Sequence, residues 1–347
     1  MMKRASAVLA LLSSLAATPA AAQVRLGEQL DAIRLAGSER MMVHVLSYKG
    51  LPAQARAARE KVLTRMGLRG QPGSVSGASF QFSPIMTHDS NINGGFASDS
   101  FTVAGIPFTI GEDYRAVGGL VLGVSGSGRA RVALGNSTAL DLRAGGSIGY
   151  APEHDMVKTS LGGTACIEHM VSYSTYANAC VDASYHGYEL GESKRIGARV
   201  GMSHIVSSSV GVHEISASVL LNRHLNTTIY NQKIGSLSVS SAIPGPFAVN
   251  LGVQVGESVS GVKAMRYRAY AGLGFLAFDR PSSVSVSLQE NEGGIWMGRE
   301  LSETITSLGV RHQISKKLTV SASVSMIDSS DSFFDDTQYG VNFAWRF

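Results

Sequence analysis

Residues 336–347 read DTQYGVNFAWRF, and their side chains alternate strictly between two faces. One face takes Tyr339, Val341, Phe343, Trp345 and Phe347, and the other takes small or polar residues. As a β-strand, this segment has an apolar side suited to lipid and a polar side suited to water, as strands of outer-membrane barrels do. We predict that the chain closes a sheet on this strand. Tyr339, Phe343, Trp345 and Phe347 are then the expected signal for the barrel assembly machinery.

The first 22 residues have the features of a secretory signal peptide. Lys3 and Arg4 precede an apolar run that ends at Leu15, and three alanines lie directly before Gln23. This arrangement is typical of a cleaved export signal and not of a membrane anchor. We therefore predict a mature chain from Gln23 onward, located in the outer membrane of a Gram-negative cell and in contact with its lipid.

The composition separates this chain from ordinary soluble domains. Charged residues make up only 16%, and glycine reaches 39 residues. After the signal, no apolar run approaches the roughly 20 residues that a membrane-spanning helix needs. A closed barrel fits, because it pairs every backbone group and needs apolar side chains on one face only. A soluble β-helix or sandwich is the alternative. The formal charge of +4, part of it in the signal peptide, gives no reason to expect nucleic-acid binding.

Residues 23–70 differ from all that follows. Two segments, 26–47 and 52–66, are rich in Ala, Leu, Arg and Glu, with apolar residues at helical spacing. We predict two helices joined around 49–51, which form a helical hairpin in the periplasm. A single hairpin is too short for a repeat array, so a small plug or docking element is expected. Residues 71–76, with Pro72 and Gly73, form the linker.

Residues 77–347 are the predicted outer-membrane barrel. They contain about fourteen alternating segments, an even number that leaves both ends in the periplasm. The expected spans are 78–85, 113–134, 138–151, 157–172, 177–189, 194–205, 209–222, 227–240, 246–257, 262–278, 282–290, 299–313, 317–328 and 337–347. Longer connections, 86–112, 291–298 and 329–336, fall on the outer side. The predicted fold is all-β: a fourteen-stranded antiparallel transmembrane β-barrel, preceded by a short periplasmic helical hairpin.

The first outer connection begins like a calcium loop. Asp89-Ser90-Asn91-Ile92-Asn93-Gly94 has the ligand spacing of such a loop, but its twelfth position is Ser100 instead of a bidentate glutamate. The flanking residues are also strand-like and not helical. We expect the Asn and Asp side chains to stabilise a tight loop, and we predict no metal and no cofactor.

The same loop resembles a known family. Asp89, Ser90, Asn91, Ile92 and Asn93 are similar to the motif that follows the first barrel strand in surface lipoprotein assembly modulators, the Slam-type outer-membrane translocators. Gly105-Ile106-Pro107-Phe108 resembles their Gly-x-Pro-Phe step, and the likeness is specific over residues 89–119. It implies a fourteen-stranded barrel that moves a protein or lipoprotein cargo to the cell surface. It also implies that Gly105, Pro107 and Phe108 belong to the family's motif loop. Members usually carry an array of helical repeats, where this chain has one hairpin.

Arginine exceeds acidic residues on the predicted inward face. The inward arginines are Arg129, Arg131, Arg143, Arg195, Arg199, Arg266, Arg268, Arg311 and Arg346, and the inward acids are Asp141, Glu168, Asp182 and Glu303. Charges that line a lumen often pair across it. The excess nevertheless predicts a lumen that attracts anions.

Cys166 and Cys180 are the two cysteines, on consecutive predicted strands with the same inward parity. The periplasm permits a disulfide. A turn centred near Tyr173 would place the two residues opposite each other, whereas a turn at 176–178 would separate them by several residues.

We predict that the protein is not an enzyme. The histidines are scattered, and neighbours such as His88 and Ser90 lie in an extended loop. His169 faces a strand segment that offers Ala179, Val181 and Ala183, none of which is a nucleophile.

Three functions fit these features. The resemblance favours a translocator that exports or displays a specific protein or lipoprotein. The alternatives are a passive diffusion porin with an anion-attracting lumen, or a structural or adhesive barrel. A translocator is expected to have a lumen plug or a weak seam together with a recruiting element, whereas a porin needs none of these.

Overall fold

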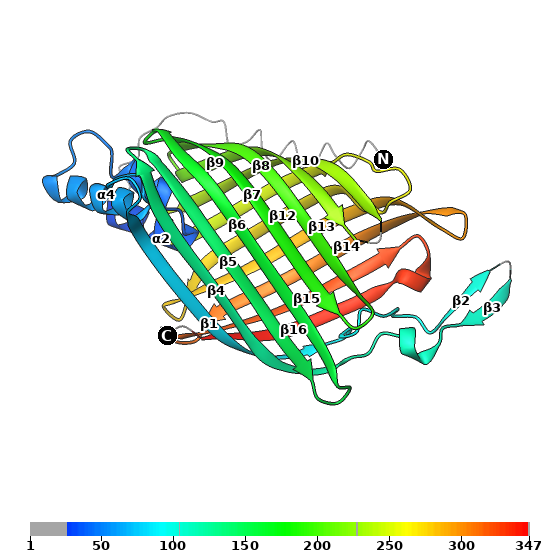
Figure 1. Ribbon diagram of the computed structural model, residues 1–347. Coiled ribbons are helices and arrows are strands. Elements are labelled where there is room, and N and C mark those ends of the chain that lie inside the picture. Colours follow the sequence, from blue (N-terminus) through cyan, green and yellow to red (C-terminus); the bar gives the residue numbers. More distant parts are fainter. Residues whose placement is uncertain (1–25, 104, 227, 346–347) are drawn as a thin grey trace.

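The computed structural model describes residues 26–103, 105–226 and 228–345 as a barrel with short helices at one mouth (Figure 1). All strand-to-strand connections at the mouth with the helices are short, whereas the long first connection lies at the other mouth. Following the predicted orientation, we call the mouth with the helices the periplasmic mouth. The predicted signal peptide, Arg346 and Phe347 lie outside the described residues.

The wall is one antiparallel 14-stranded sheet in the order β1-β4-β5-β6-β7-β8-β9-β10-β11-β12-β13-β14-β15-β16. Its strands are β1 (Val75–Asp89), β4 (Gly119–Gly135), β5 (Thr138–Ala151), β6 (Met156–Ser172), β7 (Thr175–Tyr188), β8 (Gly191–Ser208), β9 (Gly211–Leu225), β10 (Ile229–Ile243), β11 (Phe247–Gly256), β12 (Ala264–Ala277), β13 (Arg280–Trp296), β14 (Arg299–Gln313), β15 (Leu318–Ser329) and β16 (Asp336–Trp345). A separate hairpin, β2 (Ser100–Val103) and β3 (Ile106–Thr109), protrudes from the first outer connection (Figure 1). The predicted fourteen-stranded antiparallel fold is confirmed.

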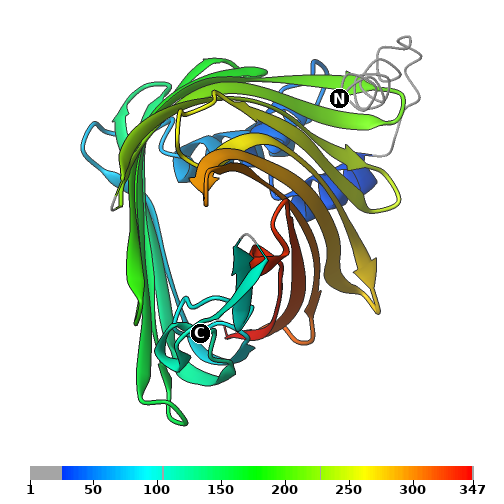
Figure 2. The ribbon, with the colours of Figure 1, turned by 90° about the vertical axis from the view of Figure 1, so that its right-hand side faces the viewer.

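The two ends of this sheet, β1 and β16, meet side by side and nearly close the barrel (Figure 2). His88 on β1 stacks on Tyr339 on β16, with ring centroids 5.5 Å apart. Within the described ranges, no hydrogen-bonded register joins the two strands. We call this contact the seam. It is held by side chains, where every other neighbouring pair in the wall is held by a backbone ladder.

Neighbouring rows of the wall face opposite sides, because side chains alternate along each strand. One row across β5 to β8 consists of Leu142, Ala165, Val181 and Ala198, which point outward. The next row consists of Arg143, Thr164, Asp182 and Gly197, which point into the lumen. The sequence period of two therefore separates a lipid-facing surface from a polar lumen.

Three helices occupy residues 26–65 of the described chain: α2 (Leu26–Ala36), α3 (Glu39–Val45) and α4 (Ala53–Arg65). We predicted two, and the first is broken at Gly37 and Ser38. Gly37 adopts a positive φ of 70°, and the Ser38 hydroxyl caps α3 by accepting from the Met41 amide. None of these helices is both long and apolar enough to span a membrane.

Helices α2 and α3 pack inside the periplasmic mouth, and α4 lies at its rim (Figure 1). Ile33, Met41, Val43 and Leu63 are completely buried in one apolar cluster. The wall side of this cluster is Ala139, Met170, Tyr176, Ile205, Val212 and Ala242, all close to the periplasmic turns. The expected hairpin in the periplasm is thus a plug, because its apolar face finds its partner on the inner wall. We call residues 26–68 the plug.

Several strand boundaries differ from the prediction. The first strand, expected at 78–85, is the longer β1, and β4 starts at Gly119, after a short 3-10 helix η1 (Glu112–Tyr114), and not at 113. The expected loop 291–298 is wrong, because β13 continues to Trp296. Gly293 and Gly294, at positive φ of 90° and 83°, form an irregularity that the strand passes through. A second 3-10 helix, η2 (Ser332–Phe334), lies in the last outer connection.

Candidate functional site

Hydroxyl groups and glycines line much of the lumen. Serine hydroxyls pair across neighbouring strands at Ser147 and Ser160 (2.7 Å), Ser203 and Ser216 (2.8 Å), Ser218 and Ser236 (2.7 Å), and Ser307 and Ser325 (2.8 Å). At other inward positions glycines face each other, as Gly145 and Gly162 do. The dense serine and glycine of the sequence therefore leave the lumen polar and keep several wall positions free of side chains.

Three arginines of the wall share one carboxylate. The register sets Arg129 opposite Arg143 and Arg131 opposite Asp141 on β4 and β5. Asp141 contacts Arg129 Nε at 3.0 Å, Arg143 Nη2 at 3.1 Å and Arg131 Nε at 3.6 Å. We call Arg129, Arg131 and Arg143 the arginine triad. Three guanidinium groups around one buried carboxylate leave this part of the wall with net positive charge.

A cavity of about 970 Å³, the lumen pocket, extends from the triad across β5 to β8. Arg129, Arg143, Arg195 and Arg199 line it, together with Asp182 and hydroxyls such as those of Ser127 and Ser184. Arg195 Nη2 lies 3.4 Å from Asp182 Oδ2. Arg199 donates to Cys180 Sγ at 3.4 Å, and no carboxylate among the described residues pairs with it. Guanidinium groups thus outnumber carboxylates here, as a site for anions requires.

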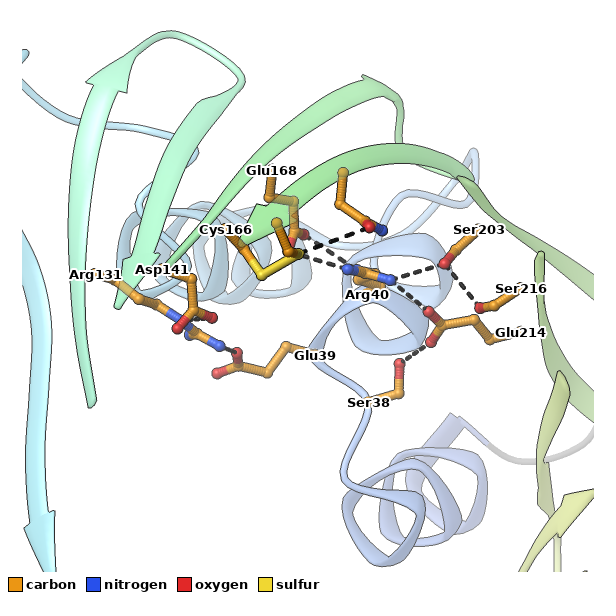
Figure 3. A network of polar contacts seen from close by, with 12 residues as sticks. Ser38, Glu39, Arg40, Arg131, Asp141, Cys166, Glu168, Ser203, Glu214 and Ser216 are labelled. Carbon is orange, nitrogen blue, oxygen red and sulfur yellow. Dashed lines mark hydrogen bonds and ion pairs between the residues drawn. A yellow bond between two sulfur atoms is a disulfide. The ribbon is translucent and has the colours of Figure 1, made fainter. Parts of the chain in front are cut away.

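The plug is anchored to the lumen wall through Arg40 (Figure 3). Its guanidinium contacts Glu168 Oε2 at 3.0 Å, Glu214 Oε1 at 2.9 Å and the Ser203 hydroxyl at 2.9 Å. Ser38 also donates to Glu214, at 2.6 Å. Burial opposes the charged form, but the two glutamates outweigh it and raise the pKa of Arg40 above its ordinary value. The anchor is therefore ionised at every physiological pH.

The neighbouring plug residue, Glu39, reaches the arginine triad (Figure 3). Its carboxylate lies 2.5 Å from Arg131 Nη2 and 2.8 Å from Arg65 Nε, which belongs to α4. Burial opposes ionisation, but the hydrogen bond and charge of Arg131, together with Arg65 and Arg129, lower the pKa of Glu39. A carboxylate of the plug is thus bound by the basic wall.

The predicted lumen arginines are divided between separate regions. Arg129, Arg131, Arg143 and Arg199 lie in the half of the lumen just described. Arg266 binds Glu292 at 3.5 Å, and Arg268 lies opposite Gln254 and Gln289. Arg311 lines a different cavity of about 310 Å³, next to Leu35 of the plug. Of the nine arginines predicted to face inward, five therefore lie in this basic region: the arginine triad, Arg195 and Arg199.

The first half of the predicted motif loop fastens the first outer connection to the outer mouth. Ile92 is buried against Val121, Ala151 and Met156. Asn93 Nδ2 donates to the Arg115 carbonyl at 2.6 Å, and Asp89 pairs with Lys158 at 2.6 Å. Asn91 donates to the Gly95 carbonyl, and the Ser90 hydroxyl is buried beside it. These contacts serve the loop itself, and no group of three metal-ligating side chains occurs in the described part of the chain.

The second half of the motif lies on the β2–β3 hairpin. Gly105 takes a positive φ of 84° near the turn, Pro107 lies opposite Thr102, and Phe108 stacks on Phe101 at 5.5 Å. Phe101 also meets Trp296 at the end of β13 and Phe333 in the last outer connection. The two halves of the motif are thus separate elements, and they do not converge on one site.

Cys166 and Cys180 are joined by a disulfide across β6 and β7. The connecting turn is at Tyr173 and Ser174, which sets the two cysteines directly opposite each other. Of the two turns considered, this is the one centred near Tyr173. The bond lies on the lumen side of β6, close to the anchor residue Glu168 (Figure 3), and Arg199 donates to Cys180 Sγ.

The aromatic residues of the predicted assembly signal face outward on β16. Tyr339, Phe343 and Trp345 are 55%, 40% and 41% exposed, opposite Val324, Val320 and Leu318 of β15. Together they form an apolar strip along the last strand. Their role in assembly stays a prediction, and Phe347 lies outside the described residues.

Sequence reasoning did not identify Glu39, Arg40 or Glu214. Glu214 alternates in phase with Ser216 and Ser218, so the period of two contained a signal for its inward position. Arg40 and Glu39 carry no such signal, because they lie 128 or more and 92 residues from their wall partners. Only the docked helices bring them together.

No family model matches this chain, and no curated protein matches it. Solved structures of outer-membrane porins are similar in shape. OccK1 (OpdK) of Pseudomonas aeruginosa has a TM-score of 0.43 and 8% identity, covering 79% of this chain and 100% of that one. OccK9 (OpdG) of the same organism scores 0.41 at 8% identity, covering 79% and 99%. The KdgM porin scores 0.33 at 12% identity, covering 55% and 95%. At these values the likeness is to the barrel architecture alone, and the resemblance to the surface lipoprotein assembly modulators gains no support.

Proposed function

We propose that this protein is an outer-membrane channel for small anionic solutes, closed at its periplasmic mouth by the plug. The observation that carries the proposal is the excess of guanidinium groups in the lumen pocket. Arg129, Arg143, Arg195 and Arg199 line it, and Asp182 is the one carboxylate that does so among the residues that the structure describes. This is the porin with an anion-attracting lumen that the sequence offered as the alternative to a translocator.

The chemistry of the lumen pocket supports this choice. A guanidinium group offers a planar fork of donors that matches a carboxylate or a phosphate. A basic wall also raises the local concentration of anions and their rate of entry. The volume of about 970 Å³ is large enough for small solutes. Serine hydroxyls on neighbouring strands can replace part of the solute's hydration shell.

Ion selectivity in planar bilayers tests the proposal. Under a potassium chloride gradient, the reversal potential should show preference for chloride. Arg143→Gln combined with Arg199→Gln should move it toward the cation side. These two arginines are chosen because Asp141 keeps two other arginine partners and Arg199 pairs with no described carboxylate.

Arg223→Gln is the matched control, because the register places Arg223 on the outward face opposite Ile196. It removes the same charge without touching the lumen pocket and should leave the reversal potential unchanged. A wild-type channel that prefers cations would contradict the proposal.

Export of a specific polypeptide is the second candidate. The seam favours it, because β1 and β16 share no backbone ladder and a wall can part where it is held by side chains alone. The resemblance over residues 89–119 also points to a translocator of protein or lipoprotein cargo. Against it, the plug is packed into the barrel and its apolar face is buried, so this face is not available to recruit cargo. The two candidates make different predictions for a locked seam.

A further inference from the structure

A second cavity, of about 790 Å³, lies between the plug and the wall. Its charged lining is Arg34, Glu39, Arg40 and Arg65 from the plug and Arg129, Arg131, Arg143, Glu168 and Glu214 from the wall. We call it the exit cavity. It shares Ser79, Arg129 and Arg143 with the lumen pocket, so a solute that moves from that pocket toward the periplasm reaches the exit cavity next.

A carboxylate is already bound in the exit cavity. Glu39 reaches Arg131 Nη2 at 2.5 Å and Arg65 Nε at 2.8 Å, so one oxygen contacts the wall and the other contacts the plug. Arg131 also belongs to the triad around Asp141. Four guanidinium groups, those of Arg65 and the triad, therefore face two carboxylates. This is a built anion site whose present occupant is tethered to the protein.

We infer that the exit cavity is a second anion-binding site, which takes the carboxylate of a passing solute in exchange for Glu39. The inference rests on the proposed function and adds to it a site and a substrate class. A solute carboxylate between Arg131 and Arg65 forms the same charge-assisted hydrogen bonds that Glu39 forms now. Glu39 is thus a stand-in for the substrate.

This exchange couples the solute to the plug. In the described part of the chain, two plug side chains form ion pairs with the wall: Glu39 with Arg131, and Arg40 with Glu168 and Glu214. A solute that binds only after Glu39 has left the site shifts the plug toward its undocked state, by as much as its affinity differs between the two states. An arriving carboxylate therefore loosens the plug that blocks its exit.

Glu39→Gln tests the exchange, because glutamine keeps the size of the side chain and removes the competing charge. Succinate serves as the probe, and titration calorimetry of the full chain in detergent measures its binding. The variant should bind succinate on the order of tenfold more tightly than the wild type. Adding Arg131→Gln to Glu39→Gln should abolish this gain.

Glu60→Gln is the matched control, because Glu60 is a plug carboxylate that contacts Arg59 and Arg69 instead of the wall. It should bind succinate as the wild type does. Equal affinity in the Glu39→Gln and Glu60→Gln variants would overturn the inference. If the wild-type channel prefers anions in that case, the proposed function stands without it, whereas a cation-selective wild type removes the proposed function itself.

If the Glu39→Gln variant fails to assemble, limited proteolysis of the wild type tests the same inference. Succinate should accelerate thermolysin cleavage within residues 26–68 several-fold relative to glucose at the same concentration, because it displaces Glu39 and loosens the plug. Cleavage at the same rate with both additives would overturn the inference. The Glu60→Gln protein should behave as the wild type does.

Discussion

Arg40 holds two carboxylates that would otherwise be left in the lumen wall without a cation. Glu168 and Glu214 are 17% and 11% exposed, and Arg40 is 22% exposed. A partly buried ion pair adds little to the free energy of unfolding compared with apolar residues at the same positions. Removal of one partner nevertheless lowers the stability, because the remaining charge stays partly desolvated and unpaired. The anchor therefore fixes where the plug docks more than it adds net stability.

Arg40→Gln should weaken the docking of the plug by about 2 kcal/mol, because it leaves both glutamates without their shared cation. Thermolysin cleavage within residues 26–68 should then be about thirtyfold faster, if cleavage follows the undocked population. Arg34→Gln is the control, because Arg34 and its partner Asp31 are 68% and 62% exposed. That variant should match the wild type, and equal cleavage of all three proteins would show that Arg40 is no anchor.

His44 makes plug docking sensitive to pH. It hydrogen-bonds Ser174 at 2.9 Å and Ser207 at 3.1 Å, packs edge-on against Tyr48 and lies close enough to His204 to be repelled by its charge. Burial, and secondly His204, lower the pKa of His44 below its ordinary value of 6.5. The docked state binds the proton less tightly than the undocked state. Docking is therefore at full strength above pH 6.5 and weakens as the pH falls from 6.5 toward the lower pKa of the docked state.

The His44→Gln variant tests this pH dependence, since glutamine can bond to both serines without a titrating group. Between pH 7.5 and 5.5, hydrogen exchange in α3 should accelerate in the wild type and change much less in the variant, after correction for the intrinsic pH dependence of exchange. Identical corrected profiles would show that another group carries the effect. Glu39 titrates below its ordinary value of 4.5 and does not contribute in this range.

The β6–β7 hairpin is the wall element that bears the plug anchor, and a disulfide fixes its register. Cys166 and Cys180 are 14 positions apart in the sequence, and Glu168 and Tyr176 on the same hairpin contact the plug. A cross-link over a loop of this length reduces the conformational entropy of the unfolded chain, which raises the free energy of the unfolded state by about 3 kcal/mol. The disulfide therefore stabilises the part of the wall that contacts the plug.

Replacement of Cys166 and Cys180 by serine should lower the free energy of unfolding by about 2–3 kcal/mol. Urea titration in detergent, with the shift in gel migration between folded and boiled protein as the readout, measures this change. A reducing agent should destabilise the wild type by a similar amount and leave the double variant unaffected. If the double variant is as stable as the oxidised wild type, the bond does not constrain the unfolded chain.

The sequence predicts a secondary-structure element well where a single periodic pattern of apolar and polar residues runs through it. The period of two over Phe247 to Gly256 predicts a strand and its inward face, because lipid and water divide the two sides of every strand. The break at Gly37 and the continuation of β13 through Gly293 were not predictable in this way. A glycine at positive φ ends a helix in one place and is accommodated within a strand in another, and only packing decides between them.

The residues of the candidate site also differ in whether a local sequence pattern could predict their positions. The inward positions of Arg129, Arg143 and Arg199 follow from alternation within single strands. The pairing of Arg40 with Glu168 and Glu214 depends on how a helix docks in the barrel, and no local sequence pattern predicts this docking. For that reason the sequence predicted a plug or docking element at residues 23–70 but not the wall residues that it contacts.

Viewed as a whole, the molecule is a wall with one weak junction. Thirteen neighbouring strand pairs are joined by backbone ladders. The seam between β1 and β16 is joined by side-chain contacts such as that of His88 with Tyr339. A channel for small solutes uses the lumen and does not need this junction to part. A translocator with a lateral exit does.

Cysteines at Thr87 and Gly340 would lock the seam, since a Cβ atom built on Gly340 lies 3.4 Å from the Thr87 hydroxyl. After crosslinking, anion conductance should be unchanged, because both residues lie on the lumen face but outside the lumen pocket. The matched control is a cysteine pair at Ser321 and Asn342, which lie opposite each other across the laddered β15 and β16. Surface and secreted proteins of cells with either locked barrel should be the same as in the wild type. Loss of a surface or secreted protein only when the seam is locked, with conductance intact, would instead make polypeptide export through the parted seam the function of this barrel.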